Sequence, residues 1–247
     1  MIVHSPADKL SAVGLLRQLK DGILDLVYPP KCVVCGDIQA LYLCDDCKSK
    51  ILELEDPLCD RCGLPLDDGP CPECQRTRFP FETARAYGVY EGTLREAVHQ
   101  LKYACRSVVA PELGELLVAY CLEHPNFAAQ ASCVVPVPIH HSRQRERGFN
   151  QSRLISGPLA VALRIPLITD ALTRRKPGIP QTGLSLEERM SNIRGVFEVV
   201  NEQRICGARI LLVDDVLTTG ATCGEAAAVL LSAGAKSVYV LTLARAC

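Results

Sequence analysis

The sequence predicts an α/β protein with a largely parallel sheet, preceded by a small cysteine-rich, metal-binding domain. Three observations support this fold class. Eight cysteines form a regular repeat before residue 80, strand patterns alternate with helical patterns from residue 84 onward, and one apolar strand near residue 213 runs into a loop of threonines and glycine. Strands that alternate with helices favour a parallel sheet covered on both faces. We expect one domain over residues 1–82 and another over residues 83–247, with separate cores.

The clustered cysteines form two copies of the unit C-x2-C-x8-C-x2-C. The four C-x-x-C pairs are Cys32/Cys35, Cys44/Cys47, Cys59/Cys62 and Cys71/Cys74. A C-x-x-C turn directs two thiolates at one point, and two such turns complete a tetrahedral site with no open position. We therefore predict two structural zinc ions, each of which helps a short segment to fold.

Other uses of these cysteines are less favoured. A disulfide framework would need a secreted protein, and no signal sequence is expected at the N-terminus. An iron–sulfur cluster does not account for the regular repeat. Pairing within each repeat is favoured, and a crossed pairing stays open. The remaining cysteines are expected to be reduced and buried; they are Cys105, Cys121, Cys133, Cys206, Cys223 and Cys247.

The composition excludes some partners. The chain has 247 residues, 48% of them hydrophobic, and a net charge of −1, so no global field draws it onto nucleic acid or an anionic membrane. Apolar residues at helical spacing between positions 12 and 26 predict an amphipathic helix that packs on the rest of the protein. A helix lying on a membrane surface is the alternative. We expect no membrane span and a cytoplasmic location.

The pattern after residue 83 predicts the elements of the second domain. Helices are expected over 93–103, 111–123, 149–163 and 221–232, with a capping box opening a short helix at 185–188. Strands are expected over 133–137, 196–200, 210–213 and 238–243. In such folds ligands bind beyond the carboxyl ends of the strands.

The segment 209–222 carries the strongest functional signal. An apolar strand ends in two adjacent carboxylates, Asp214 and Asp215, and a loop containing Gly220 then leads into a helix. Backbone N–H groups at a helix N-terminus suit a phosphate, and a glycine lets the backbone approach it closely. Paired carboxylates suit the hydroxyls of a ribose. A capped strand-to-helix turn without a ligand is the structural alternative.

The segment 209–222 resembles the motif that binds phosphoribosyl pyrophosphate (PRPP) in type I phosphoribosyltransferases. Over nearly its full length the chain resembles the ComF family, also called ComFC or GntX, which is associated with competence and DNA uptake or use. The double cysteine repeat, the segment 90–103, the sequence V-P-V-P at 135–138 and R-G-F-N-Q at 147–151 carry this resemblance. It implies a type I phosphoribosyltransferase sheet preceded by a double zinc ribbon.

The resemblance also implies roles for individual residues. Asp214 and Asp215 would hold the ribose hydroxyls of Mg²⁺-PRPP. The 5′-phosphate would lie on Thr218, Thr219, Gly220, Ala221 and Thr222. Arg143, Arg145 and Arg147, expected in a loop after Pro138, would face the pyrophosphate, or else form a solvated basic face. Arg174, Arg175 and Lys176 are expected in a mobile loop that closes over the leaving group, which would make Arg174 and Lys176 catalytic together with the two aspartates.

One departure limits the expected activity. Purine-salvage members of the superfamily have an aspartate where this chain has Thr218, so hypoxanthine or guanine is not the expected acceptor. Three functions stay open: a phosphoribosyltransferase, a PRPP- or nucleotide-sensing protein that assists single-stranded DNA, and a scaffold for a protein partner in the uptake machinery. The absence of Trp and the 5% aromatic content disfavour broad single-strand binding by stacking.

Overall fold

The structure, a computed structural model, describes residues 29–67, 69–102, 107–176 and 195–247. Several expectations fall outside these ranges: the amphipathic helix over 12–26, Cys105, and the capping box at 185–188. Within the described part, no helix has the length and apolar character needed to cross a lipid bilayer.

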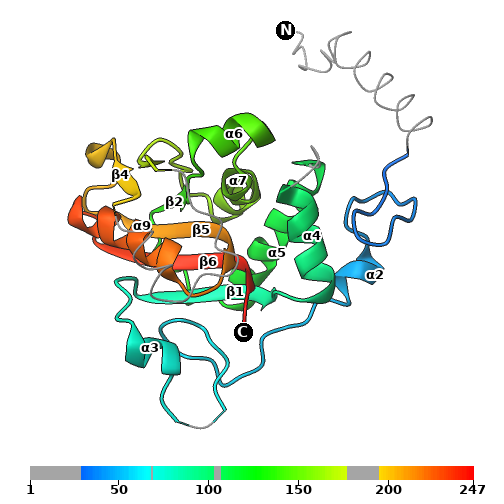
Figure 1. The fold of residues 1–247 in the computed structure, drawn as a ribbon, viewed down its shortest axis with the longest axis horizontal. Helices are drawn as coiled ribbons and strands as arrows, with labels where there is room; N and C mark the ends of the chain where they lie inside the picture. Colours follow the sequence, from blue (N-terminus) through cyan, green and yellow to red (C-terminus); the bar gives the residue numbers. More distant parts are fainter. Residues whose placement is uncertain (1–28, 68, 103–106, 177–194) are drawn as a thin grey trace, which may run out of the picture.

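The centre of the fold is a four-stranded sheet whose strands are all parallel (Figure 1). Its order is β1-β6-β5-β2. Strand β5 is buried at almost every position, as expected for a strand with neighbours on both sides and cover on both faces. The α/β class and the parallel sheet are thereby confirmed. The strands are β1 (Thr83–Val89), β2 (Cys133–Pro136), β5 (Arg209–Leu217) and β6 (Ser237–Arg245).

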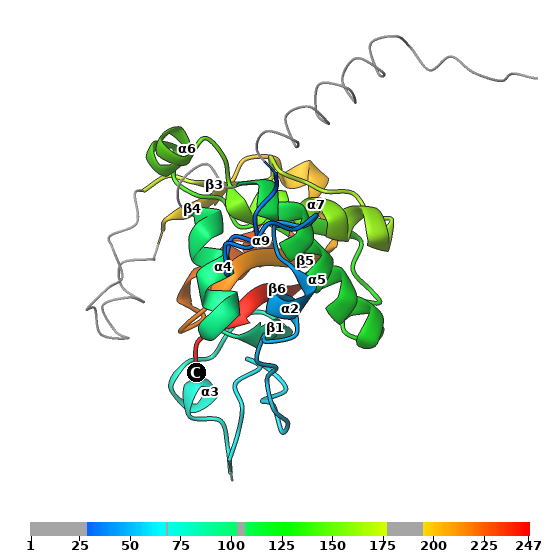
Figure 2. The ribbon, with the colours of Figure 1, turned by 90° about the vertical axis from the view of Figure 1, so that its right-hand side faces the viewer.

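Helices cover both faces of this sheet. One face is covered by α4 (Gly92–Lys102), α5 (Ala110–Glu123) and α7 (Gln151–Leu163), as Figures 1 and 2 show. The other face is covered by α9 (Ala221–Ser232) and by an antiparallel pair of short strands, β3 (Leu172–Arg174) and β4 (Phe197–Val199). Short elements complete the described part: α2 (Asp45–Lys48), α3 (Pro72–Arg76), η1 (Ser107–Val109) and η2 (Glu202–Arg204).

One segment differs from the expectation. The residues after Pro138, expected as a loop, form the helix α6 (His141–Arg147). The ring of His140 accepts a hydrogen bond from the backbone N–H of Ser142, which caps the first turn, and Gly148 ends the helix with a φ of 84°. Its sequence carries no apolar stripe, so hydrophobic periodicity gave no sign of a helix.

The expectation of separate cores was wrong. The buried cysteines of the first repeat belong to one hydrophobic cluster with α4, α5 and α7, and those of the second repeat belong to the cluster that contains α9 and β3. Leu211 and Leu212 of β5 lie in the first and second clusters respectively, so the two repeats pack on opposite faces of one sheet. Figure 1 shows α2 beside α4, and α3 apart from it below β1.

Candidate functional site

The eight cysteines of the repeat form two compact groups. Cys32, Cys35, Cys44 and Cys47 form one, Cys59, Cys62, Cys71 and Cys74 form the other, and within each group the sulfur atoms lie within 4.8 Å of one another. The grouping is the sequential one. In a tetrahedral site with Zn–S bonds of about 2.3 Å, neighbouring sulfur atoms are about 3.8 Å apart. The observed sulfur–sulfur distances are close to this value: 3.8 Å for Cys35–Cys44, 3.7 Å for Cys59–Cys74 and 3.5 Å for Cys62–Cys71. Both groups therefore fit a zinc ion.

The first group is held to the sheet by a carboxylate of α5. Glu112 accepts hydrogen bonds from the backbone N–H groups of Tyr42, at 2.8 Å, and Leu43, so the turn just before Cys44 is fixed from outside the repeat. Leu43 is fully buried in the cluster beneath. A partner of this kind orients a metal ligand through its backbone.

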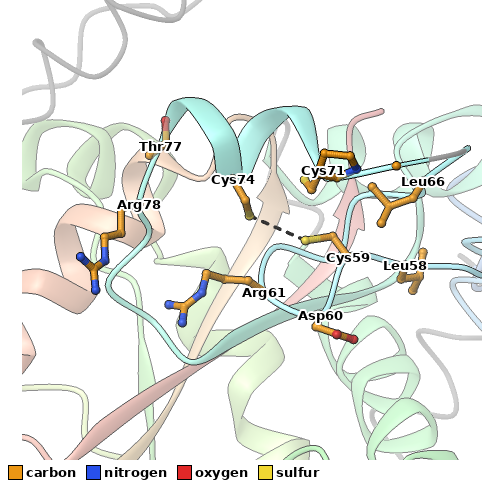
Figure 3. A pocket seen from close by; sticks show the side chains of 11 residues that line it. Leu58, Cys59, Asp60, Arg61, Leu66, Cys71, Cys74, Thr77 and Arg78 are labelled. Carbon is orange, nitrogen blue, oxygen red and sulfur yellow. Dashed lines mark hydrogen bonds between the residues drawn. The ribbon is translucent and has the colours of Figure 1, made fainter.

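The second group is held by an arginine within the repeat itself. Arg61 Nη1 donates to the carbonyl oxygens of Phe79, at 2.9 Å, and Phe81, at 2.8 Å. Figure 3 shows Cys59 and Cys74 directed toward one another above Arg61, in a hollow of about 450 Å³. This hollow lies on the cysteine group and not at the acidic pair.

The acidic pair lies at the carboxyl end of β5, where sequence analysis placed it. Asp214 and Asp215 are 9% and 6% exposed. Asp214 Oδ1 accepts from Ser152 Oγ at 2.8 Å and from the backbone N–H of Asp215 at 2.9 Å. Asp215 Oδ2 accepts from Gln151 Nε2 at 3.0 Å and lies 3.2 Å from Lys102 Nζ. Two helices, α4 and α7, thus bring three side chains to the two carboxylates.

These surroundings affect the two carboxylates differently. Burial, followed by repulsion from Asp215, raises the pKa of Asp214 to about 7. Burial disfavours the charged form of Lys102, but the combined effect of Asp215, Tyr90 and Asp214 outweighs it and raises the pKa of Lys102. Asp215 therefore has a cation in place, whereas the hydrogen bonds that Asp214 accepts within the described part of the chain come from neutral donors. A bound cation, or a ligand whose hydroxyl groups donate hydrogen bonds, would stabilise the charged form of the Asp214 carboxylate.

The loop after β5 is built around Gly220. Gly220 is the N-cap of α9 with a φ of 74°, in the left-handed region that favours glycine. A Cβ at this position would also lie 2.7 Å from Cε1 of Phe79, a ring that is itself buried. Thr218, Thr219 and Thr222 are half-buried around it, while Ala221 is buried. The backbone N–H groups of this first turn of α9 are suited to an anion.

The basic residues expected at the site differ in the contacts that link them to the Asp214–Asp215 pair. Arg147 of α6 donates to Gln151 Oε1 at 3.2 Å, and Gln151 in turn donates to Asp215. Arg174 was expected in a mobile loop, but it is the last residue of β3 and pairs with Phe197 of β4. Its buried Nε has no hydrogen-bond partner among the described residues. Burial, followed by the charge of Arg143, lowers the pKa of Arg174.

Two neighbours of Arg174 lie farther from the site. Arg175 forms an ion pair with Glu198 on the exposed side of the short hairpin. Lys176 is exposed, and within the described part of the chain no contact joins its side chain to the two carboxylates. Residues 177–194, which follow it, lie outside the described part of the chain.

Sequence reasoning missed three residues of the site: Lys102, Gln151 and Ser152. Each belongs to a helix that was expected, but its role depends on where that helix packs. Lys102 and Gln151 lie within the segments that carry the family resemblance, and this was the available signal.

Two groups of four cysteines, packed on a parallel α/β domain with an acidic pair at a strand end, define an α/β protein with a double zinc ribbon. Comparison with known proteins agrees. Residues 23–77 match the family model described as a double zinc ribbon domain. The DNA utilization protein YhgH of Escherichia coli K12 is 33% identical over 227 residues, covering 89% of this chain and 99% of that protein. Competence protein F of Haemophilus influenzae is 30% identical, covering 87% and 97%. The chain belongs to the ComF family.

Among solved structures, the glutamine PRPP amidotransferase of B. subtilis overlaps with 53% of this chain and 25% of its own, at 23% identity and a TM-score of 0.36. At that score the likeness supports no functional conclusion. The relatives in E. coli and H. influenzae are named for DNA utilization and competence.

Proposed function

We propose that this protein binds Mg²⁺-PRPP at the carboxyl edge of its parallel sheet and that this activity serves the use of external DNA. The observation that carries the proposal is the Asp214–Asp215 pair, which is buried at the end of β5 immediately before a loop built around Gly220. Burying two adjacent carboxylates costs free energy, and a ligand that uses their charge accounts for that cost.

The surrounding residues suit the parts of PRPP. The ribose hydroxyls would donate to the carboxylates, and residues 218–222 would hold the 5′-phosphate through backbone N–H groups and threonine hydroxyls. Arg174, whose buried Nε has no hydrogen-bond partner in the described part, offers a donor to the pyrophosphate. Arg143, whose positive charge acts on Arg174, and Arg147, which donates to Gln151, would extend that basic surface. Lys176 and the segment after it would close the site.

Magnesium would come with the ligand. It binds chiefly to phosphate and ribose oxygens and takes few protein ligands, so the carboxylates need supply only a small part of its shell. Zinc, in contrast, is proposed as structural at both thiolate groups. We propose a reducing compartment such as the cytoplasm, in which cysteines that hold zinc are not oxidised to disulfides.

The link to DNA is proposed from the family. Relatives are named for competence and DNA utilization. We propose that PRPP is bound first, at the acidic pair, and that any single-stranded DNA or protein partner acts beside this site. Transfer of the phosphoribosyl group to an acceptor would make the protein an enzyme.

Calorimetry with Mg²⁺-PRPP tests the proposal. Charge-assisted hydrogen bonds contribute about 1.5–3 kcal/mol each, so replacing both Asp214 and Asp215 with asparagine should weaken binding by about two orders of magnitude or more. Arg204→Gln is a matched control, because Arg204 pairs with Asp170 on an exposed surface and takes no part in the site. Wild-type protein that shows no binding at millimolar PRPP, or a double variant that binds equally well, would refute the proposal.

A further inference from the structure

A buried arginine from the last strand of the sheet lies against the second cysteine group. Arg245, the last residue of β6, is 2% exposed, and its Nη2 donates to Cys62 Sγ at 3.8 Å. Its Nε has no hydrogen-bond partner, and among the described residues no carboxylate forms an ion pair with it. Since a guanidinium keeps its proton in proteins, its burial requires an anion nearby.

The second cysteine group supplies that anion when it holds zinc. Four thiolates around one divalent ion leave a net charge of −2, and Cys62 is almost fully buried, so its sulfur has little access to water. The cation and the thiolate complex therefore neutralise one another inside the protein. Arg245 has the position of an outer partner that orients a metal ligand and favours its charged form.

Arg245 is also joined to the start of the loop formed by residues 218–222, called the phosphate loop below because it is proposed to hold the 5′-phosphate. Its backbone pairs with Leu217, the last residue of β5, and the next residue, Ala246, donates its N–H to the carbonyl oxygen of Leu217 at 2.9 Å. Leu217 directly precedes Thr218. A shift of the end of β6 would thus move the residue at which the loop begins.

A second contact reaches the other end of the loop. The ring of Phe79, which follows the second cysteine group, lies so close to Gly220 that no side chain would fit between them. Arg61, next to Cys62 in the sequence, fixes the Phe79 carbonyl. The second cysteine group is therefore linked to this loop in two ways: through Arg245 to Leu217, just before the loop, and through Phe79 to Gly220, at its end.

We propose that metal loading of the second cysteine group is coupled to the order of the phosphate loop, and that Arg245 is the positioning residue that carries this coupling. The inference rests on the zinc binding proposed above, but it does not require that PRPP be the ligand of the loop. Loss of the second zinc would leave Arg245 buried without its anion, and the ends of β5 and β6 would rearrange.

Cadmium-113 NMR of the full-length, cadmium-loaded protein tests the first half of this proposal. Two tetrathiolate signals are expected in the wild type. Arg245→Met, which keeps an unbranched stem as long as that of arginine up to Nε and removes the charged group, should shift one signal only. Glu112→Gln is the matched control, because Glu112 holds the backbone of the first group, and it should shift the other signal. Transfer of metal from the second group to a chelator should be about tenfold to a hundredfold faster in Arg245→Met.

Amide hydrogen exchange of the zinc-loaded protein without ligand tests the second half. Residues 218–222 should exchange faster in Arg245→Met and remain as in the wild type in Glu112→Gln. If Arg245→Met does not fold, Arg245→Lys takes its place: a shift of one cadmium signal supports the proposal. Unchanged cadmium signals, or unchanged exchange at 218–222, overturn it. A protein that binds neither cadmium nor zinc would refute the zinc assignment instead, and failure to bind PRPP would leave both readouts intact.

Discussion

Replacing Asp214 with asparagine should stabilise the fold, whereas the same replacement at Asp215 should destabilise it. The two carboxylates are adjacent in sequence and similarly buried, but among the described residues Lys102 forms an ion pair with Asp215, at 3.2 Å from Nζ, and not with Asp214. An asparagine at position 214 keeps an oxygen that can accept from Ser152 Oγ and from the backbone N–H of residue 215, and it removes the buried charge.

The size of the effect at Asp214 follows from its pKa. A rise from the ordinary value of about 3.9 to about 7 is about three units, which sets an upper limit of about 4 kcal/mol on the stability gained by removing the charge. Between these pH values the folded state keeps a proton that the unfolded state releases, so the stability of the wild type falls as pH rises. The gain from asparagine should therefore be largest above pH 7 and disappear below about pH 4.

At Asp215 the sign reverses. Asparagine leaves the Lys102 ammonium, whose side chain is 22% exposed, without its counter-charge. Breaking a fully buried pair costs about 3–5 kcal/mol, and partial access of Lys102 to water reduces this to about 1–3 kcal/mol.

Urea unfolding of the two single variants and the wild type, zinc-loaded and without ligand, measures both effects between pH 4 and pH 8. Equal slopes against denaturant concentration would show that the comparison concerns stability alone. A less stable Asp214→Asn at pH 8, or a gain that does not change with pH, would refute the reasoning about buried charge at this site.

Two further outcomes are expected. Metal analysis should give two zinc ions per chain. Cys59→Ser should lower the thermal midpoint of the sheet as well as that of the ribbon, because the second cysteine group is part of the hydrophobic core on one face of the sheet. A sheet that melts as in the wild type would contradict this shared core. Gly220→Ala should destabilise the fold by about 1–3 kcal/mol because of its φ of 74°, and should abolish PRPP binding because the new Cβ meets Phe79; calorimetry showing unchanged affinity would contradict the role of this loop.

Local patterns were enough to predict the main elements and the acidic pair. The run from Arg209 to Asp215 is apolar until its two carboxylates, and Gly220 precedes an alanine-rich helix, so strand, loop and helix could all be read from adjacent residues. The edge strand β1 and the three-residue strands β3 and β4 carry weaker patterns, and β1 and β3 were not predicted individually.

What could not be predicted depends on packing between distant segments. Ser152 and Lys102 reach the carboxylates because α7 begins and α4 ends at the same edge of the sheet. Ser152 is 62 residues from Asp214 in the sequence. Separate cores were expected because the cysteine repeat is a distinct sequence unit. A segment of this size cannot bury a core of its own, however, so its buried cysteines pack on the sheet.

The first ribbon, which holds Cys32–Cys47, and the second ribbon, which holds Cys59–Cys74, pack on opposite faces of the sheet. Each ribbon contacts an element that carries part of the site. The first ribbon and α4 together line one groove, to which Val33 and Tyr42 contribute from the ribbon and Glu96 from the helix. The last residue of α4 is Lys102, so this ribbon supports the helix that neutralises Asp215. The second ribbon supports the loop around Gly220 through Phe79. Each ribbon thus stabilises one side of the proposed PRPP site, and loss of either metal should disturb a different part of it.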